Sequence, residues 1–354
     1  MSVRRIIETF EGWRAERIPA VLATVYETLG STYSKAGQRI VIAGDGRYQG
    51  LVSGGCLEGD LAERARSVIA TNEAASVTYD MRDDADDVFG LGVGCNGLIR
   101  ILLQPLTAGN GYEPFRTLGE LMLAHERVVT ATIIESADAA QKPGATIICR
   151  RGQEPQAFGE STLAPHILSR CEQILTSGAA SLERFDGSSV LYAPLSSVPR
   201  LLILGAGLDA VPLVNMAAEL GWWTEVCDHR PAYLERGDLV RADRVQHVDP
   251  RALSADVDLT GFDAAIVMSH HLVTDCSYLR ELAAIETPYI GVLGPRDRKH
   301  RLLSELGSVA HNLERRLRGP IGLDIGARSP ETIALSILAE LQGVLAGSLG
   351  AQSR

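Results

Sequence analysis

The sequence predicts an α/β protein in two parts, a duplicated α/β domain over residues 1–198 and a doubly wound parallel sheet over residues 199–354. Two observations lead to this prediction. In the first part, one order of strand and helix patterns occurs twice, over about residues 20–106 and 128–195. In the second part, short apolar strand patterns alternate with helical patterns, as in parallel sheets whose strands are joined by helices.

Each copy of the repeat is expected to hold two strands, a helix and a final strand. A turn closed by Gly50 or Gly159 precedes the helix in each copy. The expected segments are residues 23–27, 35–42, 57–70 and 99–103 in the first copy and residues 131–135, 142–148, 165–175 and 190–193 in the second. A match between only two copies is also consistent with chance similarity.

The loop before the first helix reads Ser-Gly-Gly-Cys at residues 53–56. Residues 51–52 resemble the end of a strand, the glycines allow positive φ, and a helical pattern starts at about Leu57. The start of a helix favours bound anions and depresses the pKa of a nearby thiol. Cys56 is therefore a candidate reactive thiol, or else a small buried cysteine that fills the turn. Residues 160–163 of the second copy hold neither glycine nor cysteine, so a site is expected in the first copy.

A second glycine-cysteine segment precedes the last strand of the first copy. Residues 90–97 hold four glycines and Cys95. Two such loops are consistent with one shared ligand, and also with a flexible turn that carries an incidental cysteine. The acidic run before this segment is consistent with a divalent cation site, but it lacks EF-hand spacing and is more typical of a solvated turn. Its members are Asp80, Asp83, Asp84, Asp86 and Asp87.

The second part opens with an apolar strand pattern at residues 200–204, followed by a glycine-rich loop and a helical pattern. The loop matches G-x-G-x-x-A through Gly205, Gly207 and Ala210. The next strand pattern ends at Asp228, at the distance where an acidic residue binds the ribose in dinucleotide-binding domains. A Rossmann-like domain is therefore predicted, with NAD(P) as a candidate cofactor. The same loop is also compatible with another phosphate group, or with a tight strand-to-helix turn alone.

Further strands are expected at residues 264–268 and 289–293, with a helix at about 278–285 between them. Polar residues gather at the predicted strand ends and are expected to line a cleft. They are Cys227, Asp228, His229, His270, His271, Asp275 and Cys276. A zinc site is an alternative, although their spacing does not match a typical zinc motif.

Two segments near the end of the chain are candidates for binding an anion. Residues 295–301 form the densest basic segment, which suits a phosphate, an acidic partner or a solvated helix start. Residues 322–328 lead to Ser329 and Pro330, which are expected to begin a helix, with Arg328 beside its N-terminus.

The composition argues against several classes of function. The 354 residues include 34 Lys and Arg against 44 Asp and Glu, and a net charge of −10 argues against a general nucleic-acid surface. The six cysteines lack paired metal-ligand spacing, and neither a targeting segment nor an 18-residue apolar run occurs. A cytoplasmic location is therefore expected.

Taken together, these motifs resemble the XdhC/CoxI family of accessory proteins, which mature molybdenum hydroxylases such as xanthine dehydrogenase. The resemblance spans most of the chain and is carried by residues 30–31, 37–39, 53–58, 92–97, 205–207, 293–294 and 322–327. The sequence departs from the family pattern in two places. Residues 33–36 read Tyr-Ser-Lys-Ala where prolines are common, and residues 269–271 of the Rossmann part read Ser-His-His where Thr-His-Asp is common.

The resemblance implies a chaperone that binds molybdenum cofactor and holds it while a cysteine desulfurase supplies sulfur for a terminal sulfido ligand. The cofactor then passes to a molybdenum hydroxylase apoenzyme of the xanthine dehydrogenase/aldehyde oxidase type. Such a protein is a maturation chaperone rather than a turnover enzyme, and a homodimer is its simplest symmetric assembly. Two other functions stay open: an NAD(P)-dependent oxidoreductase in which Cys56 is structural, and an assembly scaffold with an acidic docking surface.

A site for molybdenum cofactor needs backbone N–H groups for the phosphate and a soft thiolate near the metal. The resemblance makes Cys56 the expected thiolate, as catalytic residue and molybdenum ligand, with Cys95 as the second candidate. The expected cofactor-binding residues are Ser53, Gly54, Gly55, Cys56, Glu58, Gly94, Cys95 and Gly97 in the first part and Gly205, Gly207, Asp228 and His270 in the second.

Overall fold

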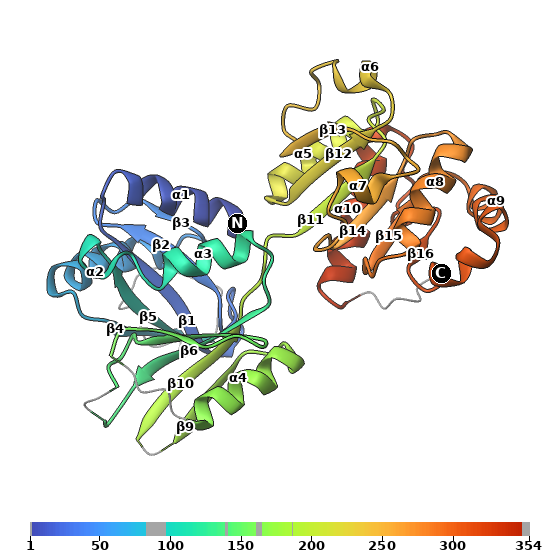
Figure 1. The fold of residues 1–354 in the computed structure, drawn as a ribbon. Coiled ribbons are helices and arrows are strands. Elements are labelled where there is room, and N and C mark those ends of the chain that lie inside the picture. The colour runs from blue at the N-terminus through green and yellow to red at the C-terminus, as the bar shows by residue number, and fades with distance from the viewer. Residues whose placement is uncertain (1, 83–96, 139–140, 161–164, 186, 349–354) are drawn as a thin grey trace. The chain divides into compact units, whose positions relative to one another are not determined.

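Figure 1 shows the computed structural model of the chain, which describes residues 2–82, 97–138, 141–160, 165–185 and 187–348. The chain divides into two compact units, Met1–Ser197 and Val198–Arg354. The first unit is built on antiparallel sheets and the second on a parallel sheet, with helices packed on both, which confirms the predicted α/β fold.

The first unit contains two five-stranded sheets with the same strand order. The order is β3-β2-β1-β5-β4 in the first sheet and β8-β7-β6-β10-β9 in the second, and all neighbouring strands are antiparallel. Each strand of one sheet therefore has a counterpart in the other, as the sequence repeat predicts. The strands are β1 (Ala20–Gly30), β2 (Arg39–Ala43), β3 (Tyr48–Gln49), β4 (Ala75–Asp80), β5 (Gly97–Leu106), β6 (Val128–Glu135), β7 (Thr146–Arg150), β8 (Gln156–Phe158), β9 (Ser181–Phe185) and β10 (Ser188–Pro194).

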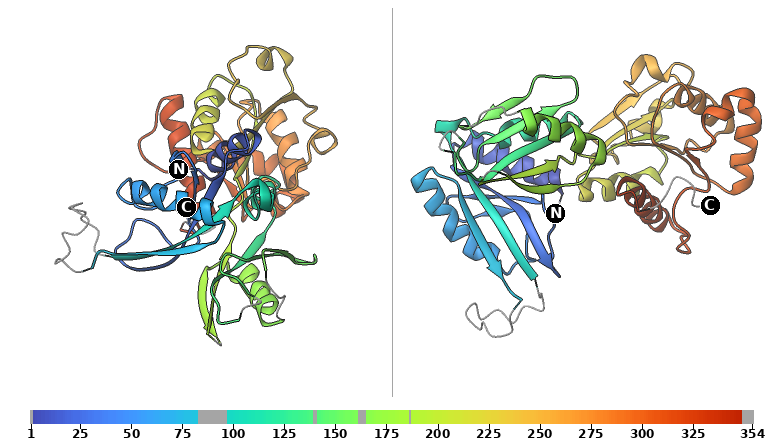
Figure 2. Two further views of the ribbon diagram at one scale, coloured as in Figure 1. Left: turned by 90° about the vertical axis from the view of Figure 1, so that its left-hand side faces the viewer. Right: turned by 90° about the horizontal axis from the view of Figure 1, so that it is seen from below.

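One helix of each copy packs along the sheet of its own copy, as Figure 2 shows for α2 (Glu58–Thr71) and α4 (Pro165–Ser177). Their buried residues recur at helical spacing and include Leu61, Ala65 and Val68 in α2 and Ile167, Cys171 and Ile174 in α4. Two helices that the repeat pattern does not predict, α1 (Val3–Ala15) and α3 (Phe115–Leu123), share a further core with residues from both sheets.

The predicted strand end at residues 51–52 is wrong. Strand β3 ends at Gln49, and Gly50 then turns the chain with a φ of +120°. A Cβ atom at Gly50 would overlap the side chain of Ile40, so only glycine fits this close crossing. The backbone N–H groups that follow bond to the side chain of Glu58 instead of to a neighbouring strand.

The second unit is a doubly wound sheet with the strand order β13-β12-β11-β14-β15-β16, and all its neighbouring strands are parallel. Strands β11, β12, β14 and β15 confirm the predicted ones. The bounds are β11 (Arg200–Leu204), β12 (Trp223–Asp228), β13 (Arg244–His247), β14 (Ala264–Val267), β15 (Tyr289–Val292) and β16 (Leu317–Arg318).

Helices cover both faces of this sheet (Figure 1). The helices are α5 (Ala210–Leu220) and α10 (Pro330–Leu345) on one face, α8 (Leu272–Ala283) and α9 (Arg296–Leu306) on the other, and the short connecting helices α6 (Pro231–Leu234) and α7 (Leu253–Asp256). Because side chains alternate along a strand, Leu201 and Ile203 of β11 pack on the first face and Leu202 and Leu204 on the second.

Two helix starts show how well the sequence predicts boundaries. Helix α10 begins as expected, because the side chain of Ser329 accepts the N–H of Thr332 and Pro330 follows as the first helical residue. Helix α8 begins at Leu272, earlier than the predicted residue 278. Its first turns bury the polar residues Thr274 and Asp275, which interrupt the apolar pattern that the prediction relied on.

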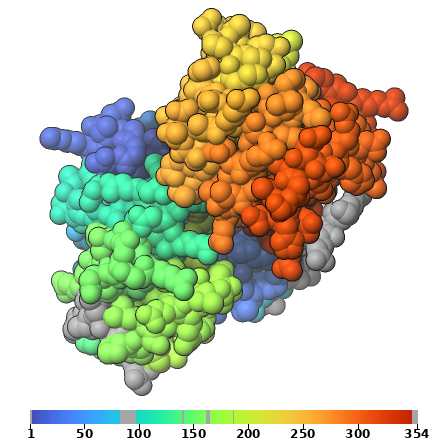
Figure 3. Space-filling view, turned by 45° about the vertical axis from the view of Figure 1, so that its right-hand side comes forward, coloured from blue at the N-terminus to red at the C-terminus, as the bar shows by residue number. Residues whose placement is uncertain are grey.

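The orange segments of the chain, which include α8 and α9, form a continuous outer surface of the second unit (Figure 3). In the described ranges, no helix is long and apolar enough to cross a membrane. The strand order of the sheet reverses between β11 and β14, and the carboxyl ends of strands at such a point form the usual ligand crevice of an open α/β sheet.

Candidate functional site

The loop that carries Cys56 is organised around the buried carboxylate of Glu58. Its Oε1 accepts the N–H groups of Val52 at 2.8 Å and Ser53 at 3.0 Å. Its Oε2 accepts the Ser53 hydroxyl at 2.5 Å and the N–H of Gly55 at 3.0 Å. Burial acts to raise the pKa of Glu58, but these hydrogen bonds outweigh it and hold the pKa below its ordinary value. Glu58 is therefore a positioning residue for the loop, bound to protein groups on both oxygens.

The two glycines turn the chain around this carboxylate. Gly54 and Gly55 have φ values of +78° and +114°, as the sequence predicts for this loop. Both are exposed, and a Cβ atom at Gly55 would meet nothing within 4 Å. Helix α2 starts at Glu58, and the thiol of Cys56 is free and partly exposed just before it. The loop thus presents a partly exposed thiol beside two exposed glycines.

The second glycine-cysteine segment falls mostly outside the described residues. Gly94 and Cys95 lie there, as do Asp83, Asp84, Asp86 and Asp87 of the acidic run. Gly97 is the first residue of β5 and is buried, and a Cβ atom there would lie 2.6 Å from the Thr32 side chain. Close packing therefore requires glycine at this position. Asp80 forms an exposed ion pair with Arg82 at 2.6 Å.

The glycine loop of the second unit is packed tightly against the ends of two strands. The N–H of Gly205 donates to the carbonyl of Cys227, and a Cβ atom at Gly205 would lie 2.5 Å from the carbonyl oxygen of Met268. The N–H of Ala206 donates to the Asp228 carboxylate at 2.7 Å. These contacts fix the position of the glycine loop at the carboxyl ends of β12 and β14.

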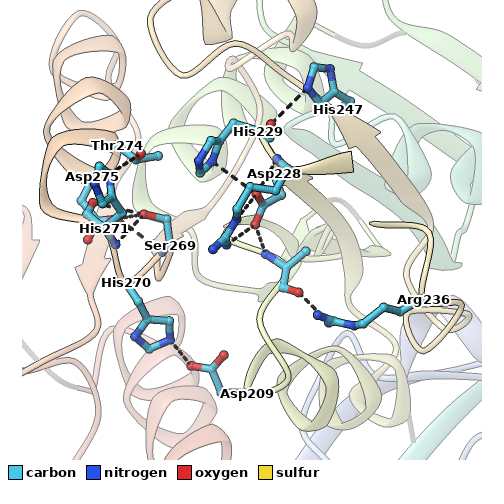
Figure 4. Close-up of polar contacts among 12 residues, drawn as sticks. Asp209, Asp228, His229, Arg236, His247, Ser269, His270, His271, Thr274 and Asp275 are labelled. Carbon is cyan, nitrogen blue, oxygen red and sulfur yellow. Dashed lines mark hydrogen bonds and ion pairs between the residues drawn. The ribbon is translucent and has the colours of Figure 1, made fainter. Parts of the chain in front are cut away.

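Asp228, the predicted ribose-binding acid, is fully buried and already bonded within the protein (Figure 4). Besides Ala206, it accepts the backbone N–H of Arg230 at 2.9 Å and the Arg230 guanidinium at 2.7 and 2.9 Å. Burial acts to raise the pKa of Asp228, but the hydrogen bonds and the charge of Arg230 lower it. A ribose would have to displace Arg230 to reach this carboxylate.

The histidines at the strand ends point to different partners (Figure 4). His270, at a φ of +62°, places its Nε2 2.7 Å from the carboxylate of Asp209, which follows Gly207 in the glycine loop. His271 places its Nδ1 2.9 Å from the hydroxyl of Thr274.

Burial raises the pKa of the Cys227 thiol. Among the described residues, no group of three or more His, Cys, Asp or Glu side chains is arranged to hold a metal ion.

A cavity of about 1130 Å³ in the second unit brings together segments that the sequence analysis treats separately. Its lining includes Asp209 and His270, residues of the predicted basic segment and the segment 322–327. Sequence analysis missed the contributions of Arg315 and Arg318 around β16 and of Glu340 in α10, because only the tertiary fold brings them to the cavity.

A smaller cavity of about 410 Å³ lies within the first unit and is lined by residues 35–39, among others. The guanidinium of Arg39 donates to the Thr130 hydroxyl at 2.9 Å. Burial lowers the pKa of Arg39 to about 10, and no carboxylate of the described residues pairs with it. Arg39 lies in residues 37–39, one of the motifs that carry the family resemblance, but its sequence pattern alone gives it no functional role.

Two family descriptions match the chain. The model of the XdhC and CoxI family matches residues 13–80, which include the Cys56 loop. The model of the XdhC Rossmann domain matches residues 201–341, which include the glycine loop and the large cavity.

Individual proteins are similar to the chain over nearly its full length. A probable xanthine dehydrogenase subunit from Bacillus subtilis is 34% identical over 91% of this chain and 92% of its own. The molybdenum cofactor insertion chaperone PaoD of Escherichia coli is 26% identical over 92% of this chain and 83% of its own.

A solved structure from Bacillus halodurans is similar to the chain in fold. It is described as a xanthine dehydrogenase, and it superimposes with a TM-score of 0.78 at 29% sequence identity. The match covers 100% of this chain and 98% of that chain. With a full-length relative at 34% identity and both units matched by family descriptions, the protein belongs to the XdhC and CoxI family.

Proposed function

We propose that this protein is a molybdenum cofactor chaperone that holds the cofactor during sulfuration and delivers it to a molybdenum hydroxylase of the xanthine dehydrogenase/aldehyde oxidase type. A cysteine desulfurase is the sulfur donor in this proposal, and the chaperone acts as a homodimer. The names of the relatives from Escherichia coli and Bacillus subtilis, a cofactor insertion chaperone and a probable xanthine dehydrogenase subunit, support this class of function.

The observation that carries the proposal is the loop built on Glu58. Four hydrogen bonds to one buried carboxylate fix the loop just before α2. That loop presents a soft sulfur donor, Cys56, next to two exposed glycines, and a Cβ atom at Gly55 would meet nothing within 4 Å. Thiolates suit soft metal centres, and open glycine backbone suits a bulky organic ligand, so the donor set fits molybdenum cofactor as cargo.

In this proposal Cys56 binds the cargo, Gly54 and Gly55 allow its close approach, and Ser53 and Glu58 hold the loop in place. The cofactor brings the molybdenum chemistry with it. The protein's task is to keep the cargo bound, oriented and accessible to the sulfur donor until transfer.

The alternative of an NAD(P)-dependent oxidoreductase has less support from the second unit. The carboxylate that would bind the ribose is buried and bonded to Arg230, and the Ala206 N–H of the glycine loop donates to the same carboxylate. Retention of NAD(H) through purification would favour this alternative.

The test is cofactor binding by the purified apoprotein. Protein is mixed anaerobically with molybdenum cofactor released from a molybdoenzyme, and bound molybdenum and pterin are quantified after ultrafiltration. We expect near-stoichiometric binding by the wild type, and loss of most of it in Cys56→Ala. Cys95→Ala reports on the second candidate thiol, and Cys276→Ala is the matched control because Cys276 is buried. A correctly folded wild type that binds no cofactor would overturn the proposal.

A further inference from the structure

We propose that the large cavity of the second unit is a binding site for a phosphate-bearing organic ligand, with Lys299 and Arg315 as its central phosphate-binding residues. The cavity and its basic residues lie entirely within this unit. The proposal therefore does not depend on molybdenum binding at the Cys56 loop.

The size of the cavity suits a whole small-molecule ligand. Its volume of about 1130 Å³ lies just above the range of about 300–1,000 Å³ that is usual for small-molecule pockets, so a cofactor-sized molecule has room there. It lies near the carboxyl ends of β14 and β15, on the side of the sheet reversal away from β12. Asp228 and Ala206 do not line it, so a ligand here does not need the ribose position that Arg230 occupies.

One wall of the cavity is basic. Arg296, Lys299 and His300 come from α9, where a spacing of three or four residues places side chains on the same helix face. Arg315 and Arg318 come from the chain around β16. Charges from two separate elements thus converge on one space.

Several of these cations have no acidic partner. Arg296, Lys299 and Arg315 form no ion pair with any carboxylate of the described residues. Lys299 is half-buried, and both burial and the positive charge of Arg318 lower its pKa. Lys299 is therefore a partly desolvated cation without a carboxylate partner among the described residues, and an anionic ligand would stabilise its charged form.

Each carboxylate that lines the cavity has an interaction partner within the protein. Asp209 pairs with His270 at 2.7 Å, and Glu314 lies 3.7 Å from His311. Glu340 accepts the Tyr289 hydroxyl at 2.8 Å and the N–H of Gly322 at 2.7 Å, and it lies 3.4 Å from Arg318. Asp324, the remaining one, is exposed and also has an interaction partner.

The rest of the lining offers apolar surface and backbone. Residues 319–327 line the cavity, and a Cβ atom at Gly322 would overlap the Ser336 side chain, so the segment packs closely against α10. Ile325 on this segment is 50% exposed. A wall of this kind can pack against a flat organic ring while the basic wall binds phosphate, which is the chemistry shared by a nucleotide and by a phosphorylated pterin.

Calorimetric titration of the full chain with pyrophosphate is the test. We expect binding by the wild type, and binding weaker by about tenfold or more in Lys299→Met with Arg315→Met, because charge-assisted hydrogen bonds to phosphate are lost. Arg301→Met is the matched control, since Arg301 is an exposed residue of α9 outside the cavity lining, and it should change the affinity less than about twofold. If the double variant does not fold, Arg315→Met alone replaces it, because Arg315 is exposed.

Competition then identifies the source of the phosphate. Displacement of pyrophosphate by ADP but not by adenosine indicates a nucleotide, and displacement by molybdenum cofactor in the Cys56→Ala background indicates the pterin phosphate. A folded wild type that binds neither pyrophosphate, ADP nor the cofactor overturns the inference, as does a double variant with unchanged affinity. Because Cys56→Ala tests the chaperone proposal separately, pyrophosphate binding that survives in that variant supports this inference even if the chaperone proposal fails.

Discussion

Two hydrogen bonds join Ser53 to Glu58 across the loop that carries Cys56. The Ser53 hydroxyl donates to Glu58 Oε2 at 2.5 Å, and the Ser53 N–H donates to Oε1 at 3.0 Å. The same hydroxyl accepts the N–H of Leu57 at 2.7 Å, at the entrance of α2. The position of the thiol therefore depends on a buried carboxylate two residues further along the chain.

Replacing this carboxylate should destabilise the protein measurably. Glu58→Gln substitutes an amide for an acceptor oxygen, so part of the donor set from Ser53 and Gly55 is left unsatisfied in a buried place. We expect the free energy of unfolding to fall by about 1–3 kcal/mol in urea titrations. Glu63→Gln, on the exposed face of the same helix, should change it by less than about 0.5 kcal/mol. Equal stabilities for the two variants would contradict the role assigned to Glu58.

Acid should reduce the difference in the free energy of unfolding between the wild type and Glu58→Gln. Hydrogen bonds hold the folded-state pKa of Glu58 below its unfolded value of about 4.3, so the stabilisation is complete above the unfolded pKa. It is lost as the pH falls through the folded pKa. Urea titrations at a series of pH values from about 6 to 3 should show the gap narrowing at the acid end. A gap that stays constant or widens would show that the charge of Glu58 is not what stabilises the loop.

The accessibility of Cys56 makes a prediction about alkylation. Cys56 is partly exposed, whereas Cys149, Cys171, Cys227 and Cys276 are buried. Burial also raises the pKa of Cys227 and Cys276, which keeps these thiols protonated. Brief treatment of the native protein with iodoacetamide should therefore modify Cys56 ahead of these four, as peptide mapping by mass spectrometry can measure. Prior loading with molybdenum cofactor should protect Cys56, and labelling at an undiminished rate in the loaded protein would argue against a cofactor at this loop.

The elements that the sequence predicts well are those with a local signal. The glycine loop at Gly205 sits between a short apolar strand and an amphipathic helix, and Ser329 and Pro330 mark a helix start by their own chemistry. The strand end expected at residues 51–52 is not formed, because the N–H groups of Val52 and of the following Ser53 donate to the Glu58 side chain, which no strand pattern can reveal.

The sites were predictable to different degrees. The loop at Cys56 is continuous in sequence, so its glycines and thiol could be named in advance. The pairing of Asp228 with Arg230 could not be predicted, because the contact between the two side chains is visible only in the folded structure. The cavity wall of Lys299 and Arg315 joins a helix to a strand region, which only the packing of the parallel sheet brings together.

The ion pair between Asp228 and Arg230 predicts that replacing the partly buried Arg230 lowers the stability of the protein strongly. Arg230→Met leaves the fully buried Asp228 carboxylate without its charged partner, so we expect a loss of about 3 kcal/mol in the free energy of unfolding. Arg241→Gln breaks an exposed pair with Glu219 and should lower it by less than about 1 kcal/mol. Thermal and urea unfolding of both variants can measure the difference. Similar small effects would mean that Asp228 is free to accept a ligand in place of Arg230.

Two glycine-to-alanine substitutions should change the free energy of unfolding in opposite directions. At Gly205 the backbone has a φ of +134°, and a Cβ atom would lie 2.5 Å from the Met268 carbonyl oxygen, which is backbone and cannot rotate away. Gly205→Ala should lower the free energy of unfolding by about 2–4 kcal/mol through overpacking and backbone strain. Gly12 lies on the exposed face of α1 with nothing within 4 Å of its Cβ position, so Gly12→Ala should raise it by about 0.5–1 kcal/mol. If urea unfolding finds Gly205→Ala as stable as the wild type, the close crossing of the glycine loop over the end of β14 is not what requires glycine there.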